Sequence, residues 1–86
     1  MSIETTESKN TYSVPNLERS FRILELLGES REGLNLTELT NATGCPNNSV
    51  FRICRTLEEL GYITRDPASK KHRISKRILN LALGAV

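Results

Sequence analysis

The most informative part of the chain is residues 36–61, with the sequence LTELTNATGCPNNSVFRICRTLEELG. Thr37 can cap a short helix by accepting a first-turn N–H, and Gly44 can supply the positive φ that ends it. Pro46 fits the first position of a second helix, because the N–H that proline lacks would have no partner there. Two short helices joined at a glycine are typical of a helix-turn-helix.

The second of these helices, expected over about residues 47–60, has two contrasting faces. Its apolar residues recur at helical spacing and should face the core: Val50, Ile53, Cys54, Leu57 and Leu60. Its other side is polar, with two arginines in its middle: Asn48, Arg52, Arg55, Thr56 and Glu59, flanked by Ser49 and Phe51. Gly61 is expected to end this helix sharply.

After Gly61 the pattern changes to that of a β-hairpin over residues 62–75. Residues 62–65 have strand propensity, residues 66–69 have turn chemistry, and residues 71–74 supply the return strand. The hairpin carries four positive charges against the single negative charge of Asp66: Arg65, Lys70, Lys71 and Arg73. We therefore expect a basic hairpin directly after the helix pair.

A longer helix is expected before the helix pair, starting near Pro15 and Asn16 and ending at Gly28. One side of it forms an apolar stripe that should face the core: Leu17, Phe21, Leu24 and Leu27. Ile23 and Leu26 lie off this stripe. They are either incidentally exposed, or part of a second buried face against a partner chain or the end of the domain.

The remaining segments are short. Residues 1–13 are mostly polar, fit neither a helical nor a strand period, and are expected to form a disordered tail. Residues 34–36 alternate Leu, Asn and Leu and could form a very short strand. Ser75 can cap a last helix over residues 76–83, which is strongly apolar for its length.

The size and charge of the chain limit its class. Its 86 residues allow one compact domain, so a large multidomain enzyme is excluded. The net charge is only +2, but residues 1–43 carry a net charge of −3 and residues 44–86 a net charge of +5. The positive charge is therefore concentrated in the half that contains the second helix and the hairpin.

Metal, cofactor and membrane functions are not expected. Cys45 and Cys54 lack the spacing of a redox or zinc motif, and His72 is the single histidine of the chain. The longest apolar stretch, residues 78–86, is too short to cross a membrane, and the N-terminus does not have the order of a signal peptide. We therefore expect an intracellular protein.

Catalysis is not expected either. The sequence has no nucleophile with a base placed near it and no glycine-rich phosphate loop. Glu58 and Glu59 are the only paired carboxylates that stand out, and they are interpreted as a solvated face of the helix. The expected activity is binding.

A helix pair followed by a basic hairpin predicts a winged helix-turn-helix, mainly α with a small β-hairpin: a three-helix core, a wing and a further helix. In this architecture the second helix of the pair enters the major groove of DNA, and basic hairpin side chains reach phosphates. The expected DNA-binding residues are Thr37, Asn47, Asn48, Ser49, Phe51, Arg52, Arg55, Arg65, Lys70, Lys71 and Arg73.

These residues differ in their expected roles. Arg52 either contacts a guanine or binds a phosphate, and Arg55 is assigned to a phosphate. Phe51 lies either at the edge of the core or against a thymine methyl group. The alternative function is that of a winged-helix protein-interaction module without specific DNA binding, whose exposed helix face should be apolar rather than polar.

Several segments of the chain also resemble a known family. They are VPNLERSFRILELL (14–27), LTEL (36–39), TGCP (43–46), SVFR (49–52), TL (56–57) and LGYI (60–63). Together they resemble the N-terminal DNA-binding domain of the IclR family of bacterial and archaeal transcriptional regulators, over about residues 14–86. Four positions depart from the usual residues of that family, namely Thr40 (alanine), Cys45 (leucine), Asn47 (lysine or arginine) and His72 (tyrosine).

The resemblance implies a domain over residues 14–75 and, in residues 76–86, the start of a linker helix leading to an effector-binding domain that this chain lacks. A small-molecule effector would act only through that domain. The resemblance further implies a homodimer that binds double-stranded operator DNA in the cytoplasm, associated with the nucleoid. The implied dimer-interface residues are Ile23, Leu26, Ile78 and Leu81.

Overall fold

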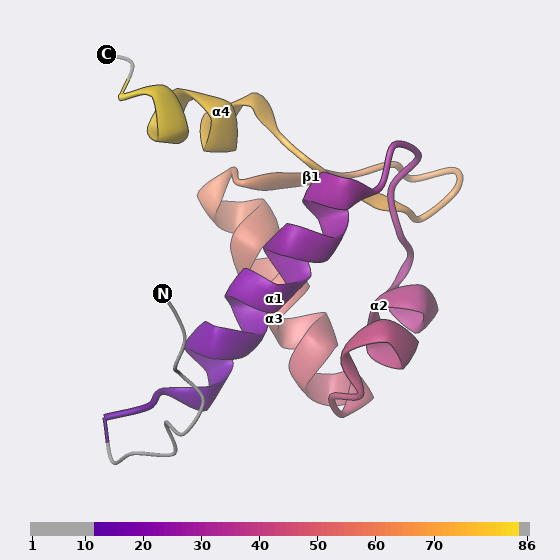
Figure 1. Ribbon diagram of the computed structural model, residues 1–86. Coiled ribbons are helices and arrows are strands. Elements are labelled where there is room, and N and C mark those ends of the chain that lie inside the picture. The colour runs from indigo at the N-terminus through magenta and orange to yellow at the C-terminus, as the bar shows by residue number, and fades with distance from the viewer. Residues whose placement is uncertain (1–11, 85–86) are drawn as a thin grey trace.

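The computed structural model describes residues 12–84, which form four helices and a two-stranded hairpin. In chain order the elements are α1 (Pro15–Glu29), α2 (Leu36–Thr43), α3 (Asn47–Leu60), β1 (Ile63–Arg65), β2 (His72–Ile74) and α4 (Lys76–Leu83) (Figure 1). The predicted fold, a winged helix-turn-helix, is confirmed. Of the predicted tail, residues 1–11 lie outside the described part of the chain, as do residues 85–86 of the predicted linker.

The core lies where the first three helices and β1 meet. Its buried apolar side chains are Ile23, Leu27, Leu39, Val50, Ile53, Cys54, Leu57 and Ile63. The apolar face predicted for α3 is confirmed except at Leu60, which is 55% exposed because it lies in the last turn of the helix. The α3 helix is thus fixed by its apolar face, and its polar face remains available.

The face of α1 that enters the core differs from the predicted stripe. Ile23 and Leu27 are buried, whereas Leu17 and Phe21 are more than half exposed. A helix turns by about 100° per residue, so Ile23 and Leu24 belong to neighbouring faces. The apolar surface of α1 is broad enough for two faces, and α2 and α3 pack against the one that contains Ile23.

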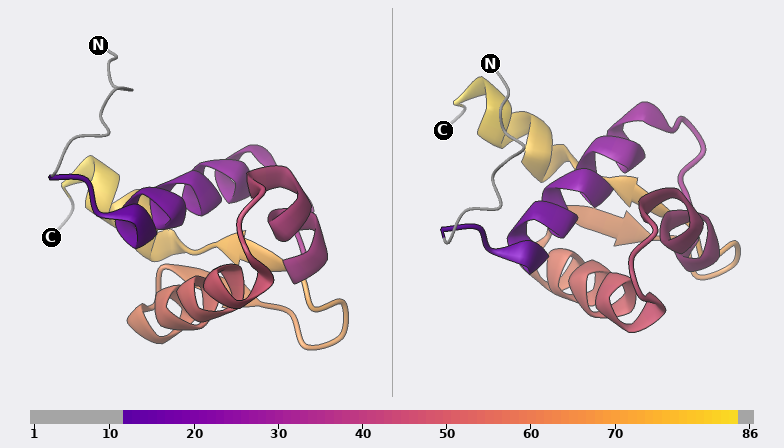
Figure 2. Two further views of the ribbon diagram at one scale, coloured as in Figure 1. Left: turned by 90° about the horizontal axis from the view of Figure 1, so that it is seen from below. Right: turned by 60° about the horizontal axis from the view of Figure 1, so that its bottom comes forward.

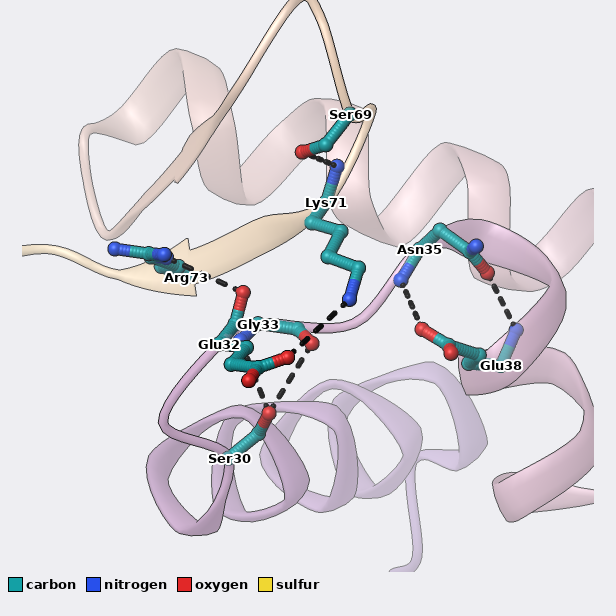
Figure 3. A network of polar contacts seen from close by, with 8 residues as sticks. All are labelled: Ser30, Glu32, Gly33, Asn35, Glu38, Ser69, Lys71 and Arg73. Carbon is teal, nitrogen blue, oxygen red and sulfur yellow. Dashed lines mark hydrogen bonds and ion pairs between the residues drawn. The ribbon is translucent and has the colours of Figure 1, made fainter.

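Two predicted helix ends are also corrected. Helix α1 continues to Glu29 rather than ending at Gly28, and α2 is capped by Asn35 rather than Thr37. The Asn35 side chain accepts from the Glu38 N–H at 2.8 Å, and the Glu38 carboxylate accepts from the Asn35 N–H at 2.9 Å (Figure 3). This capping box satisfies two free N–H groups, which Thr37 could not do alone.

The hairpin is joined to the loop between α1 and α2. Strands β1 and β2 are antiparallel, with Arg65 opposite His72. The Leu34 N–H donates to the His72 carbonyl at 3.1 Å, and the His72 N–H donates to the Leu34 carbonyl at 2.8 Å. The short strand predicted at residues 34–36 is therefore a single β-bridge. Gly33 precedes it with a φ of 89°, and a Cβ there would lie 2.5 Å from the His72 carbonyl oxygen.

Helix α4 lies at the opposite end of the molecule from the hairpin turn (Figures 1 and 2). The Ser75 side chain caps it, as predicted, by accepting from the Arg77 N–H at 3.2 Å. The Ser75 hydroxyl also donates to the Gly61 carbonyl at 2.6 Å, and the Arg77 guanidinium lies 5.3 Å from the centre of the Tyr62 ring. No residue of α4 is buried, so its apolar side chains remain accessible.

Candidate nucleic-acid interface

The outward side of α3 has the polar composition that the sequence predicts. Asn48, Phe51, Arg52 and Arg55 are exposed, and Ser49 is half-buried. They project from a helix whose opposite side is fixed in the core, so their direction is set by packing. The helix-turn-helix thus presents a polar surface that contains two arginines.

The first residue of α3 is joined to α2. The Thr40 hydroxyl donates to the Asn47 side-chain oxygen at 3.1 Å. These are two of the positions at which the sequence departs from the resembled family, and they contact each other. The contact fixes the Asn47 side chain at the start of α3, where the free N–H groups of the helix are found.

A cleft of about 470 Å³ separates α3 from the wing. We call it the α3–wing cleft; its lining comes from the start of α2, one side of α3 and the hairpin. It brings together five of the predicted DNA-binding residues: Thr37, Phe51, Arg55, Arg65 and Lys70. Three of these five are cationic, so positive charge is concentrated in the cleft. The packing of α2, α3 and the hairpin sets its width.

Arg55 is held in this cleft by an aromatic neighbour. Its guanidinium carbon lies 6.0 Å from the centre of the Phe51 ring, within the range of a cation–π contact. Phe51 is 47% exposed and one turn before Arg55 on the same helix. Its ring therefore orients the arginine and also presents an apolar surface of its own.

The turn of the wing is stabilised by Asp66. Its carboxylate accepts from the Ser69 N–H at 2.7 Å, and its carbonyl accepts from the Lys70 N–H at 2.7 Å. The bond from the Ser69 N–H is the main cause that lowers the pKa of the Asp66 carboxyl group. Lys70 has a φ of 64°, in the left-handed region that few side chains adopt. The turn thus holds Lys70, which lines the cleft, in an unfavourable backbone conformation.

The other two basic residues of the wing contact the loop between α1 and α2. The Lys71 ammonium lies 3.8 Å from the Glu32 carboxylate, and the Arg73 Nε donates to the Glu32 carbonyl at 3.4 Å (Figure 3). The sequence grouped all four cations of the hairpin together. In the structure Arg65 and Lys70 share the α3–wing cleft, whereas Lys71 and Arg73 share Glu32.

The sequence pattern did not predict one polar contact inside the domain, between His72 and Glu58. His72 is 4% exposed, and its Nε2 lies 3.1 Å from a carboxylate oxygen of Glu58. Glu58 was expected on a solvated face, which is wrong, whereas His72 is a strand residue as expected but is also buried. The alternation of His72 and Ile74 along β2 is the signal that would have placed the histidine on the inner side of the strand.

Cys54 lies beside this pair and is buried in the core. Burial raises the pKa of its thiol to about 11, and the negative charge of Glu58 adds to the effect. The thiol is therefore protonated near neutral pH and packs as a small apolar side chain.

A second hollow, of about 560 Å³, lies between α1, α3 and α4. We call it the α1–α4 groove; its apolar lining is Leu17, Phe21, Leu24, Ile53, Leu57, Leu60, Tyr62, Ile78 and Leu81. Two of the predicted dimer-interface residues, Ile78 and Leu81, line it. The contribution of Leu17 and Phe21 was not foreseen, because both were assigned to the core.

The other two predicted interface residues lie elsewhere. Leu26 is half-buried and packs against the edge of the core. Ile23 is 0% exposed and cannot contact a partner while the domain is folded, so its assignment to an interface is wrong. It forms part of the face of α1 that packs on α2 and α3.

Within residues 12–84, no group of three or more His, Cys, Asp or Glu side chains is placed to hold a metal ion. Over the same residues, no helix has the length and apolar character needed to cross a membrane.

Comparison with known proteins gives consistent matches. Residues 16–67 match the family model described as the IclR helix-turn-helix domain. The HTH-type transcriptional regulator KdgR of Dickeya chrysanthemi is 31% identical over 78 residues, which are 91% of this chain and 25% of that protein. The IclR-family transcriptional regulator of Brucella abortus is 27% identical, with a TM-score of 0.81, and the match covers 95% of this chain and 31% of that one.

The repressor BlcR of Agobacterium tumefaciens is 32% identical, with a TM-score of 0.75 over 86% of this chain and 29% of that one. The chain thus spans between a quarter and a third of the length of these relatives. The first two are transcriptional regulators by name and the third is a repressor, and the matched part is the winged helix-turn-helix. The family match covers more than half of the sequence, so this chain belongs to the IclR family and contains its helix-turn-helix domain.

Proposed function

We propose that the domain binds double-stranded DNA in a sequence-specific manner, with α3 in the major groove and the wing on the phosphates. The observation that carries this proposal is the convergence of Arg55, Arg65 and Lys70 in the α3–wing cleft, beside the polar face of α3. A helix fits the major groove, and cations of an adjacent hairpin then face the phosphates that border it. The function is binding rather than catalysis.

Several residues in the first three turns of α3 have a role in this proposal. Asn48 and Ser49 lie in the first turn, which enters the groove in a helix-turn-helix, and contact bases or phosphates. Arg52 contacts a guanine or a phosphate, and Arg55 binds a phosphate from its position beside Phe51. The exposed Phe51 ring contacts a thymine methyl group. Asn47 and Thr37 lie at the starts of α3 and α2 and contribute polar groups to the same surface.

The wing contributes mainly charge. Arg65 and Lys70 bind phosphates from the cleft, and Lys71 and Arg73 add attraction from the side of the hairpin that faces Glu32. Phosphate contacts release counterions, so this part of the affinity depends on salt concentration and not on sequence.

We also propose that two copies associate through α1 and α4. The α1–α4 groove is lined mainly by apolar side chains, although Ser49 and Arg52 also line it, and its Phe21 and Leu81 are 58% and 66% exposed. A second copy that covers this groove would remove these side chains from water. The interface proposed here contains Ile78 and Leu81, as the resemblance implies, together with Leu17 and Phe21; Leu26, which the resemblance also implies, does not line the groove.

In the whole protein, this domain would place a transcriptional regulator on its operator in the cytoplasm of a bacterium or archaeon, at the nucleoid. A small-molecule effector would act through a C-terminal domain to which α4 leads. The competing function, a winged-helix protein-interaction module, is disfavoured by the polar face of α3, since a docking helix presents apolar residues at that position.

The experiment that tests this proposal is selection from a random-sequence duplex pool, with sequencing, at two salt concentrations. Enrichment of a palindromic motif is expected, because a symmetric dimer contacts two half-sites. Salt-sensitive binding without any enriched motif would contradict specific recognition and leave only phosphate binding. Absence of binding would favour the protein-interaction function.

A further inference from the structure

The wing and α3 are joined by a polar contact between His72 and Glu58, whose side chains are 5% and 24% exposed. On one side of the imidazole ring, Nε2 lies 3.1 Å from the Glu58 carboxylate. On the other side, Nδ1 lies 3.4 Å from the Leu34 carbonyl oxygen. The main chain of His72 also makes both hydrogen bonds of the bridge to Leu34. This one residue therefore contacts the α1–α2 loop, the wing and α3.

Both ring nitrogens of His72 face groups that only accept hydrogen bonds. An N–H of the imidazole can donate to either partner. In residues 12–84, His72 is the sole buried side chain that is polar or charged. Displacement of the wing would separate the His72 ring from Glu58 and from the Leu34 carbonyl, and the loss of these contacts is costly. The pair therefore favours one position of β2 on α3.

This position sets the spacing of the cations in the α3–wing cleft. Arg65 is directly opposite His72 in the hairpin, and Arg65, Lys70 and Arg55 line the cleft together with Glu58. We propose that Glu58 and His72 are positioning residues for DNA binding, because their contact fixes the cations of the wing relative to α3. This inference rests on the proposed DNA-binding function.

Electrostatics alone predicts the opposite effect of Glu58. Its carboxylate lies in a cleft that would face DNA phosphates, so removal of its negative charge should strengthen binding. A positioning role predicts that removal of the carboxylate weakens binding, because the wing loses its fixed place. The sign of the change in affinity therefore separates the two roles.

The test compares three variants by the anisotropy of a fluorescent random-sequence DNA duplex over a series of salt concentrations. We expect Glu58→Leu to bind about five- to tenfold more weakly, with a shallower salt dependence, because the contact with the His72 ring is lost. Glu58→Gln retains an oxygen that accepts the Nε2 proton, and should stay within about threefold of the unmodified domain. Glu59→Gln, the matched control, removes a charge from the adjacent exposed residue and should bind equally or more tightly.

Thermal unfolding followed by circular dichroism shows which variants are folded. A folded Glu58→Leu variant that binds as tightly as the unmodified domain would overturn the inference, as would Glu58→Gln binding more weakly than Glu58→Leu. If Glu58→Leu does not fold, His72→Phe is used instead, since it keeps a ring in the buried site without a donor to Glu58. Unchanged affinity in His72→Phe would overturn the inference. Failure of the unmodified domain to bind the duplex at any salt concentration would instead overturn the proposed function.

Discussion

The ammonium group of Lys71 lies 3.8 Å from the carboxylate of Glu32, whereas its neighbour Lys70 lines the α3–wing cleft. Adjacent lysines thus have different surroundings. The side chain of Lys71 is 31% exposed and has a nearby negative charge, so it should contribute less to the attraction of phosphates.

We therefore expect Lys70→Ala to lower the slope of log affinity against log salt concentration by about 1, and Lys71→Ala to lower it by less. The slopes are measured by fluorescence anisotropy with a random-sequence duplex. Glu32→Gln is the matched control, and it should leave the Lys70 effect intact. Equal changes in the two lysine variants would show that the contact with Glu32 has no influence on binding.

A glycine substitution at Lys70 should change stability and DNA binding in opposite directions. Its φ of 64° is unfavourable for any residue with a Cβ, and glycine removes that cost. We expect Lys70→Gly to raise the free energy of unfolding by about 0.5 kcal/mol while it weakens binding to duplex DNA. Urea unfolding and the anisotropy assay measure the two effects. Lys71→Gly should stabilise nothing, and a destabilised Lys70→Gly variant would refute the expectation.

Arg52 and Arg55 should have different effects on sequence preference. If Arg52 contacts a guanine, Arg52→Ala should cost about 1–3 kcal/mol on the selected duplex and relax the preference at one base pair. Arg55→Ala should weaken binding to all sequences to a similar extent, because its expected partner is a phosphate. Selection from the random pool is repeated with each variant. An unchanged motif and affinity with Arg52→Ala would remove that residue from the interface.

Two glycines with positive φ should differ in their tolerance of alanine. At Gly44 a Cβ would meet no atom within 4 Å, so Gly44→Ala should cost only the left-handed conformation, about 1 kcal/mol. At Gly33 a Cβ would lie 2.5 Å from the His72 carbonyl oxygen, and the backbone would have to move. Gly33→Ala should therefore be less stable than Gly44→Ala by at least about 1 kcal/mol in urea unfolding. Equal losses of stability in the two variants would mean that the Leu34–His72 bridge adapts to the added Cβ without a free-energy cost.

The buried thiol predicts a loss of stability at alkaline pH. The folded-state pKa of Cys54 is about 11, against an ordinary value of 9.0, so between these values the unfolded chain has lost a proton that the folded chain retains. The contribution of the Cys54 thiol to the free energy of unfolding is fully present below pH 9. It falls by on the order of 2 kcal/mol as the pH rises towards 11.

Urea unfolding over this pH range, compared between the unmodified domain and Cys54→Ala, isolates the contribution of the thiol from that of lysine and tyrosine side chains. The unmodified domain should lose more stability than the variant as the pH rises. Parallel curves would contradict the burial effect on the thiol.

The sequence predicted the features that depend on local chemistry. Gly44 and Gly61 end helices at positive φ, and Val50 and Ile53 form part of a buried face, as their spacing indicated. The stripe predicted for α1 was right at Leu24 and Leu27 but wrong at Leu17 and Phe21, because the apolar surface of the helix is wider than one stripe. Periodicity cannot choose between Ile23 and Phe21 when both have apolar neighbours at helical spacing; packing against α2 and α3 makes that choice.

Contacts between distant segments were not predictable from the pattern. Nothing in the local sequence pairs Glu58 with His72, or Lys71 with Glu32, since each contact depends on where the hairpin docks. The left-handed conformation of Lys70 was missed for a related reason. The turn requires this conformation so that the Lys70 N–H can donate to the Asp66 carbonyl, although a lysine disfavours a positive φ.

The bridge at Leu34 has a consequence for the order of folding. It joins residues 38 positions apart, whereas α2 and α3 meet through Thr40 and Asn47, only seven positions apart. Closure of longer loops is entropically more costly, so contacts of large sequence separation form late. The helix-turn-helix can therefore assemble before the hairpin docks on Leu34. A molecule at that stage has α3 but no cleft beside it, so under the proposed mode of binding a high affinity for DNA would report that folding is complete.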